Sequence, residues 1–289
     1  MFREVIAGVD GKPNSRDAVA LAGQLVGDGA RLTLAHVYDD RSLVGADVAD
    51  LERHDSLELL AREREEASVD ADLVAVPARS VGAGLHEIAE RREADLLVVG
   101  SCSRGALGRL LLGDDRRASL DGAPCAVAIA PSGYARAPRP IARIGVAYDG
   151  TPESEHALAL ARSVAEQRNS SISALTVVSV PTYSYGTMAA VDWGAVVEGM
   201  AQAARERLAG LEGVSGHVVR GVAVEELAAW SSSVDLLIVG SRGYGPVRRV
   251  VFGSTSEYLA RSTECPLLVL RRGLPAVQAA GAAPASALA

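Results

Sequence analysis

Short apolar runs alternate along nearly the whole chain with segments whose apolar residues recur at helical spacing. The run at 5–9, for example, precedes Asn14 and Ser15, which can cap a helix, and then apolar positions that share one helical face. In the first half strands are predicted at 5–9, 32–37, 73–76, 96–99 and 126–130. Helices are expected from Asn14 or Ser15 onward, over 47–67, around 85–92 and, as a short helix, after Gly113. Strands that alternate with helices predict a parallel, doubly wound sheet with right-handed crossovers.

The same order of elements occurs twice. The segment DLLVVGS at 95–101 recurs as DLLIVGS at 235–241, 140 residues further on, and the same spacing joins Gly113 to Gly253 and Cys125 to Cys265. Second-half strands are predicted near 144–148, 173–178, 216–219, 236–239 and 267–270. We therefore expect a duplication, since ordered matches at nearly constant spacing span both halves. The domains expected are 1–133 and 141–273, with a linker at 134–140 and a flexible tail at 274–289.

Composition supports an α/β class and excludes several partners. Apolar residues make up 48% of the chain and aromatic residues 4%, which suits buried parallel strands built from small aliphatic side chains. A net charge of -7 gives no general attraction to nucleic acid or to an anionic membrane. The three cysteines form no CxxC pair, and no apolar run approaches the roughly 20 residues that span a bilayer. With no leader segment visible at the start, these features predict a cytoplasmic protein.

A glycine-rich segment follows the fourth strand of the second half. It reads GSRGYGPVRRVVFGSTS over 240–256, which spaces Gly240, Gly243 and Gly253 and then adds Ser254 and Thr255. Glycines let a backbone come close to a ligand, and a helix that opens at Gly253 would offer free N–H groups to a phosphate. In open α/β sheets such segments lie beyond the carboxyl ends of the strands, where ligands bind.

This spacing resembles the ATP-binding signature of the universal stress protein family, and Asp149 at the end of the first strand matches the family's aspartate on the nucleoside side. The resemblance covers about 1–131 and 141–272 and implies two tandem five-stranded domains of the adenine nucleotide α-hydrolase-like fold. It also implies ATP, with or without Mg²⁺, as the ligand. By this likeness Asp149 and Gly150 face the ribose and adenine, Val177 and Val239 flank the base, Arg242 lends charge, and the backbone of Gly240, Gly243, Gly253, Ser254 and Thr255 holds the triphosphate.

The first half departs from this pattern. Ser103 stands where the family has its second glycine, and Asp114 and Asp115 replace the small hydroxyl residues after Gly113. A Cβ obstructs a close approach where the backbone needs φ > 0, and Asp114 can itself cap the helix and repel a polyanion. We therefore predict that the first half binds ATP poorly or not at all.

Simpler interpretations stay open for each motif. Gly253 and Ser254 can be an ordinary turn and helix cap, Asp149 an ordinary strand-end turn residue, and Arg242 part of a solvated or interface surface. Cys102, in the degenerate loop, is either a reactive thiol or inert packing. The five histidines show no metal-ligand spacing, and no metal site is predicted.

Three functions are compatible with these features. The first is a regulatory ATP-binding stress protein, not an enzyme beyond slow hydrolysis, in which nucleotide changes conformation or association. The second is a structural or interaction member of the family that binds no nucleotide. The third, an ATP-consuming ligase or adenylyl transferase, is disfavoured because no SGGxDS or HxGH motif occurs. The resemblance also implies a pseudo-dimer of the two halves through 126–130 and 267–270, and a further homodimer of whole chains. The apolar helix near 189–208 is expected to pack on the other half or on another chain.

Overall fold

The computed structural model describes residues 2–39, 46–101, 122–179, 193–240, 250 and 253–271. The short helix predicted after Gly113 and the tail predicted at 274–289 lie outside these residues, as do Cys102, Ser103, Asp114 and Asp115.

The first half alternates strands and helices as its pattern predicts. Its elements are β1 (Phe2–Gly8), α1 (Pro13–Leu25), β2 (Val26–Asp39), α2 (Ala46–Ala67), β3 (Asp72–Ala78), α3 (Val81–Arg91), β4 (Leu96–Gly100) and β5 (Ala126–Ala130). A single 3-10 turn, η1 (Tyr134–Arg136), follows β5.

The second half repeats this order. Its elements are β6 (Arg143–Ala147), α5 (Pro152–Arg168), β7 (Ser171–Val178), α6 (Trp193–Ala209), β8 (Val214–Arg220), α7 (Ala223–Trp230), η3 (Ser231–Ser233), β9 (Leu236–Gly240), α8 (Ser254–Ser262) and β10 (Leu267–Leu270). Local sequence sets several of these helix ends. The Thr151 side chain accepts from the Ser154 N–H and Pro152 occupies the first turn, so α5 starts there, and Asn169 in the left-handed region ends it.

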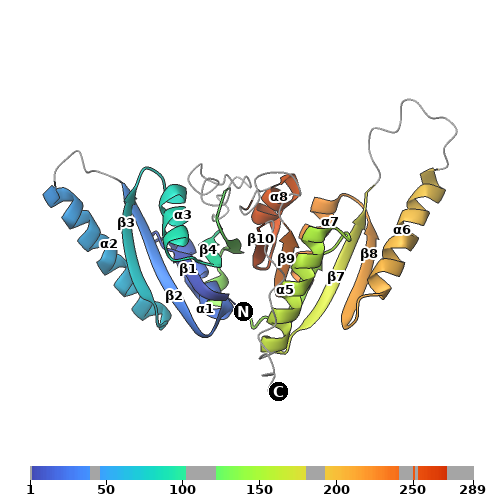
Figure 1. Ribbon diagram of the computed structural model, residues 1–289, viewed down its shortest axis with the longest axis horizontal. Helices are drawn as coiled ribbons and strands as arrows, with labels where there is room; N and C mark the ends of the chain where they lie inside the picture. Colours follow the sequence, from blue (N-terminus) through green and yellow to red (C-terminus); the bar gives the residue numbers. More distant parts are fainter. Residues whose placement is uncertain are drawn as a thin grey trace, which may run out of the picture.

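The ten strands in the described ranges form one sheet in the order β3-β2-β1-β4-β5-β10-β9-β6-β7-β8. Within each half the neighbouring strands are parallel, whereas β5 and β10 pair antiparallel, with Leu268 opposite Ala128. Figure 1 shows the result: β5 and β10 lie at the centre, and β3 with α2 and β8 with α6 lie at opposite ends. The pairing predicted between the last strands of the two halves is confirmed.

The core is aliphatic, as the composition suggests. Every residue of β5 and β10 is buried, and one apolar cluster runs through both halves. Strand β2 is longer than the predicted 32–37, because Val26–Ala30 extends it with a register shift against β1 and with Gly29 at φ +69°. That added stretch carries few apolar residues, so hydrophobic patterning did not indicate it.

The segment between the halves is tied to α1. The buried carboxylate of Asp17 accepts hydrogen bonds from the main-chain N–H groups of Gly133 (2.8 Å) and Ala135 (2.7 Å). Tyr134 between them is buried. The domain boundaries proposed from the sequence stay predictions, but the path of the chain at 133–135 is fixed by these contacts.

Helix α6 lies at the outer end of the second half, far from the first (Figure 1). Its Val196 and Met200 side chains are 42% and 48% exposed. The apolar side of this helix therefore does not pack on the other half, which was one of the two expectations for it.

Candidate functional site

The strand order of the second half reverses between β6 and β9. Strand β6 pairs with β7 on one side and with β9 on the other, and the carboxyl ends of all three strands face the same edge of the sheet. A cavity of about 710 Å³ lies there. Seven of the ten residues predicted for the nucleotide site line it: Asp149, Val177, Val239, Gly240, Gly253, Ser254 and Thr255. The structure thus brings together residues spread over more than 100 positions of sequence.

Asp149 closes the end of β6 in a tight turn. Its Oδ1 accepts hydrogen bonds from the Thr151 main-chain N–H (3.0 Å) and the Thr151 Oγ1 hydroxyl (2.6 Å). Burial opposes its ionisation, but the hydrogen bonds from Thr151 and Ser154 outweigh that effect and hold the pKa of Asp149 below its ordinary value. A fixed carboxylate, ionised at neutral pH, therefore stands at one end of the cavity.

Gly150 has a conformational role in this turn. Its φ of +81° lies in the left-handed region, and its N–H donates to Ser154 Oγ (3.1 Å). The side chain of Arg207 packs against it and donates through Nη1 to the Asp149 carbonyl (3.1 Å). Gly150 is not among the described residues that line the cavity, so it shapes the turn that presents Asp149.

The walls of the cavity are apolar. Val177 and Val239 are the next-to-last residues of β7 and β9, while Leu175 and Leu227 add further aliphatic surface. Such walls can hold a flat heteroaromatic ring between them by dispersion and burial.

Gly240 is required by packing. A Cβ on Gly240 would lie 2.8 Å from the Glu153 Cβ in the first turn of α5. In the first half a Cβ on Gly100 would lie 2.0 Å from the Asn14 carbonyl oxygen. Both glycines therefore let the first helix of their half press against the fourth strand, whether or not a ligand binds.

The amino end of α8 forms another side of the cavity. Gly253 is its N-cap, and no side chain among the described residues caps the first-turn amides there. The Ser256 hydroxyl turns back to the Gly253 main chain, at 2.9 Å from its N and 3.2 Å from its O. The neighbouring helix α5 is capped by Thr151, and α7, whose Ala223 also lines the cavity, carries Glu225 and Glu226 in its first turn. The amino end of α8 therefore suits a bound anion better than either of them. Arg242 and Gly243, the other two residues predicted for the site, lie outside the described residues.

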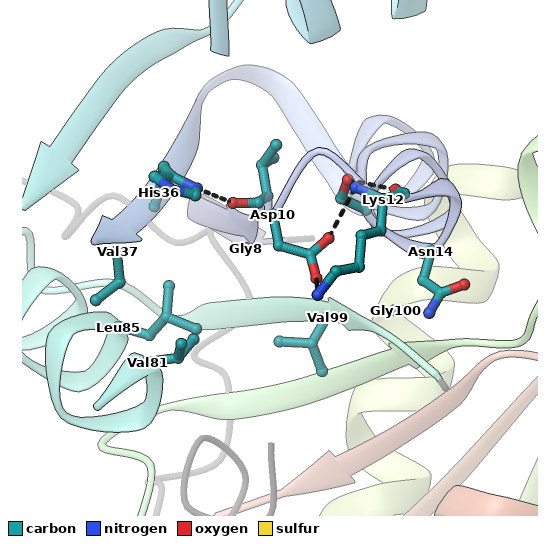
Figure 2. A pocket seen from close by; sticks show the side chains of 13 residues that line it. Gly8, Asp10, Lys12, Asn14, His36, Val37, Val81, Leu85, Val99 and Gly100 are labelled. Atoms are coloured by element: carbon teal, nitrogen blue, oxygen red, sulfur yellow. Dashed lines mark hydrogen bonds and ion pairs between the residues drawn. The ribbon is translucent and has the colours of Figure 1, made fainter. Parts of the chain in front are cut away.

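The equivalent pocket of the first half is much smaller, at about 180 Å³. Figure 2 shows Val37, Val81, Leu85 and Val99 on one side of it and Lys12 beside Asp10 on the other. The two carboxylate oxygens of Asp10 both contact Lys12: Oδ1 accepts from its main-chain N–H (3.1 Å) and Oδ2 lies 3.4 Å from its Nζ. Lys12 stands where the second half has Thr151.

Lys12 could not be predicted as part of this pocket, because the lysine lies beside the matched aspartate and not within the matched pattern. Tyr148 could not be predicted either; it lines the second cavity and donates its hydroxyl to Glu155. Burial and that carboxylate raise the pKa of Tyr148 to about 12. The pairing of Tyr148 with Glu155 carries no sequence signal beyond a tyrosine at the end of a strand.

Two kinds of feature are absent from the described parts of the chain. No helix there is long and apolar enough to cross a membrane. Those residues also contain no group of three or more histidine, cysteine, aspartate or glutamate side chains that could hold a metal ion.

The fold and this site define a tandem α/β protein of the universal stress protein class. The model of the universal stress protein family matches residues 1–131 and 140–271, and the chain belongs to that family.

Two proteins of Mycobacterium tuberculosis (strain H37Rv) are among its relatives. Universal stress protein Rv2005c is 33% identical over 187 residues, and universal stress protein Rv2623 is 32% identical over 190 residues. The matched regions span 62% and 63% of this chain and 63% of each relative's length.

Among solved structures, a universal stress protein from Archaeoglobus fulgidus superposes with a TM-score of 0.63 at 21% identity, over 94% of this chain and 99% of the other. That likeness shows the shared fold of the whole tandem unit. Another universal stress protein, which matches 41% of this chain at 25% identity with a TM-score of 0.30, was solved in complex with cAMP.

Proposed function

We propose that this protein is a regulatory universal stress protein that binds one ATP per chain, in the second half. The observation that carries the proposal is the cavity at the β6–β9 switch point, which joins an ionised aspartate, aliphatic walls and a helix end that no described side chain caps. These three parts suit the ribose, the base and the phosphates of a nucleotide by their chemistry alone.

Each part of the cavity matches one part of ATP. The carboxylate of Asp149 can accept hydrogen bonds from ribose hydroxyls. Val177 and Val239 lie at the strand ends beside it, where an adenine ring can be held by apolar contact. The amides of Ser254 and Thr255 and the dipole of α8 favour the negatively charged phosphates, with Arg242 and Gly243 proposed to assist.

The cavity volume is also adequate. Pockets for small molecules and cofactors usually measure roughly 300–1,000 Å³, and this one measures about 710 Å³. The first-half pocket, at about 180 Å³ and with its aspartate held by Lys12, falls below that range. These features support a single ATP site.

The duplication supplies a matched pair of variants for the test. Asp149→Ala and Asp10→Ala remove equivalent carboxylates that accept equivalent turn hydrogen bonds. Titration calorimetry with ATP and Mg²⁺ should give one site per wild-type chain, weaker binding in Asp149→Ala and unchanged binding in Asp10→Ala. Two equivalent sites per chain, or the same loss in both variants, would refute the proposal.

The competing functions predict different results in the same assays. A structural member that binds no nucleotide should show no rise in melting temperature with millimolar ATP and Mg²⁺. An occupied site at a hundred times its dissociation constant should stabilise the fold by about 2.7 kcal/mol. A ligase or adenylyl transferase would release pyrophosphate when supplied with ATP and an acceptor.

We propose a regulatory role because the Asp149 carboxylate, which pairs with the Thr151 hydroxyl in the cavity, also accepts the Thr151 main-chain N–H and so serves to fix the turn after β6. Nucleotide would then act by stabilising the second half and its contacts, with at most slow hydrolysis. Cytoplasmic location and a homodimer of whole chains belong to the same proposal. Sedimentation analysis with and without ATP tests the homodimer.

A further inference from the structure

The segment that leads into α8 is bonded to the first half of the chain. Val250 lies three residues before the N-cap Gly253, and its main-chain N–H donates to the Ala123 carbonyl (2.9 Å). In return, the Gly122 N–H donates to the Val250 carbonyl (2.8 Å). Both main-chain groups of Val250 are therefore satisfied by residues from the other half.

These two hydrogen bonds form a bridge between the halves, and side chains reinforce it. Val250 and Ala123 are fully buried in one apolar cluster, which also holds Leu259 of α8 and Leu267 of β10. Beside them, Arg271 Nη1 donates to the Pro124 carbonyl (2.7 Å). Residues 122–124 are thus held to the second half at two places.

Gly122 adopts a conformation that other residues rarely take. Its φ is +84°, while the nearest atom to a Cβ placed there would be His86 Cε1 at 3.9 Å. Space does not demand a glycine at this position, but the left-handed backbone that directs its N–H toward Val250 does.

The bridge limits where the amino end of α8 can lie. Three residues of extended chain span at most roughly 11 Å, so a fixed Val250 keeps Gly253 within that distance. Leu259 of α8, in the same buried cluster as Val250, ties the helix more closely to this point. We propose that Gly122 and Ala123 are positioning residues for the phosphate-binding end of the second-half site. The first half, predicted to bind ATP poorly itself, then completes the site of the second; this inference rests on the proposed ATP-binding function.

The binding of the two ends of the nucleotide should respond differently to a change at Gly122. Asp149, Val177 and Val239 extend from β6, β7 and β9, which belong to the second half alone. Disturbing Gly122 should therefore weaken the binding of phosphates and leave the binding of the nucleoside unchanged.

The principal test compares Gly122→Ala with Gly213→Ala in the full chain. Gly213 also has a positive φ, +72°, with no atom within 4 Å of an added Cβ, and it lies in the turn between α6 and β8. The two variants therefore carry the same kind of backbone strain at different places. We expect Gly122→Ala to lose about ten- to a hundredfold in ATP affinity with adenosine affinity unchanged, because small misplacements of a binding group are costly. Gly213→Ala should bind both ligands as the wild type does.

A second pair of variants tests the bridge at Val250. Val250→Ala and Val127→Ala each remove two buried methyl groups from the same cluster, but Val127 lies on β5 and not in the segment before α8. Both should lower the melting temperature, whereas only Val250→Ala should weaken ATP binding. Hydrogen exchange adds an independent measure, since ATP should slow exchange of the Gly122 amide in the wild type.

The outcomes distinguish this inference from the function on which it rests. If the wild type fails to bind ATP, the proposed function fails and the inference with it. If the wild type binds ATP but Gly122→Ala matches Gly213→Ala, or loses adenosine and ATP equally, the inference alone is overturned.

Discussion

Gly253 is the position where helix stability and ATP binding should respond in opposite directions to one substitution. As the N-cap of α8 it has φ −82° and ψ 171°, a conformation open to any L-residue. Aspartate there can accept a hydrogen bond from the Thr255 or Ser256 N–H, which is the usual behaviour of an aspartate N-cap. Gly253→Asp therefore fits the backbone, caps the helix and adds a negative charge beside the cavity.

The expected magnitudes follow from this geometry. Replacing an N-cap glycine by aspartate should stabilise the protein by a few tenths of a kcal/mol. A carboxylate about 4 Å from a phosphate charge repels it by roughly 4 kcal/mol at an effective dielectric constant of about 20. The same carboxylate occupies an N–H donor whose hydrogen bond to a charged group is worth about 1.5–3 kcal/mol. Halving the repulsion for the open side of the cavity still leaves more than about a hundredfold loss of affinity.

Calorimetry and thermal unfolding of Gly253→Asp measure the two responses separately. ATP binding should disappear while the melting temperature of the free protein stays level or rises. Gly253→Asn, which caps the helix without a charge, should lose affinity to a smaller extent. ATP affinity of Gly253→Asp within about threefold of the wild type would refute the assignment of the phosphates to α8, given the hundredfold loss expected above.

Three further outcomes test the fold around the site. Gly240→Ala should cost about 1–3 kcal/mol of stability, because the added methyl would lie 2.8 Å from a side-chain carbon of α5; an unchanged melting temperature would contradict the packing role. Burial opposes ionisation of Asp235, but its hydrogen bonds with Arg143 hold the pKa of Asp235 below its ordinary 3.8. The stability that this carboxylate contributes is therefore complete above pH 3.8 and lost as the pH falls below that value. In Asp235→Asn the free energy of unfolding should fall less steeply as the solution is acidified. Burial raises the pKa of Cys125 and Cys265 to about 12, so in a Cys102→Ser variant a disulfide reagent at neutral pH should find no reactive thiol until the protein unfolds.

Much of the fold could be predicted because the pattern is strong and occurs twice. Buried strands such as Leu96–Gly100 and Leu236–Gly240 are continuous aliphatic runs, and each copy supports the assignment of the other. The added length of β2 could not be predicted, since only Val26 at its start pairs with β1 and packs on the core, and the next three residues, Gly27–Gly29, carry no apolar side chain.

The candidate site was predictable to a smaller extent. Asp149, Val177 and Val239 stand at strand ends, and topology alone brings strand ends of one sheet to a common edge. Gly240 was predicted as a ligand contact, whereas its position shows that helix packing requires a glycine there in any case. The contacts of Lys12, Arg207 and Val250 depend on long side chains or on the meeting of the two halves, and neither leaves a local pattern.

The antiparallel pairing of β5 with β10 joins two copies that differ in sequence and that belong to one polypeptide chain. In an assembly of separate identical subunits, every substitution appears on both sides of the symmetry axis and the association depends on dilution. Here each copy can change alone, and the ratio of the two is fixed when the chain is synthesised. A substitution can therefore alter one copy without appearing in the other, while the altered copy stays a permanent partner of its neighbour.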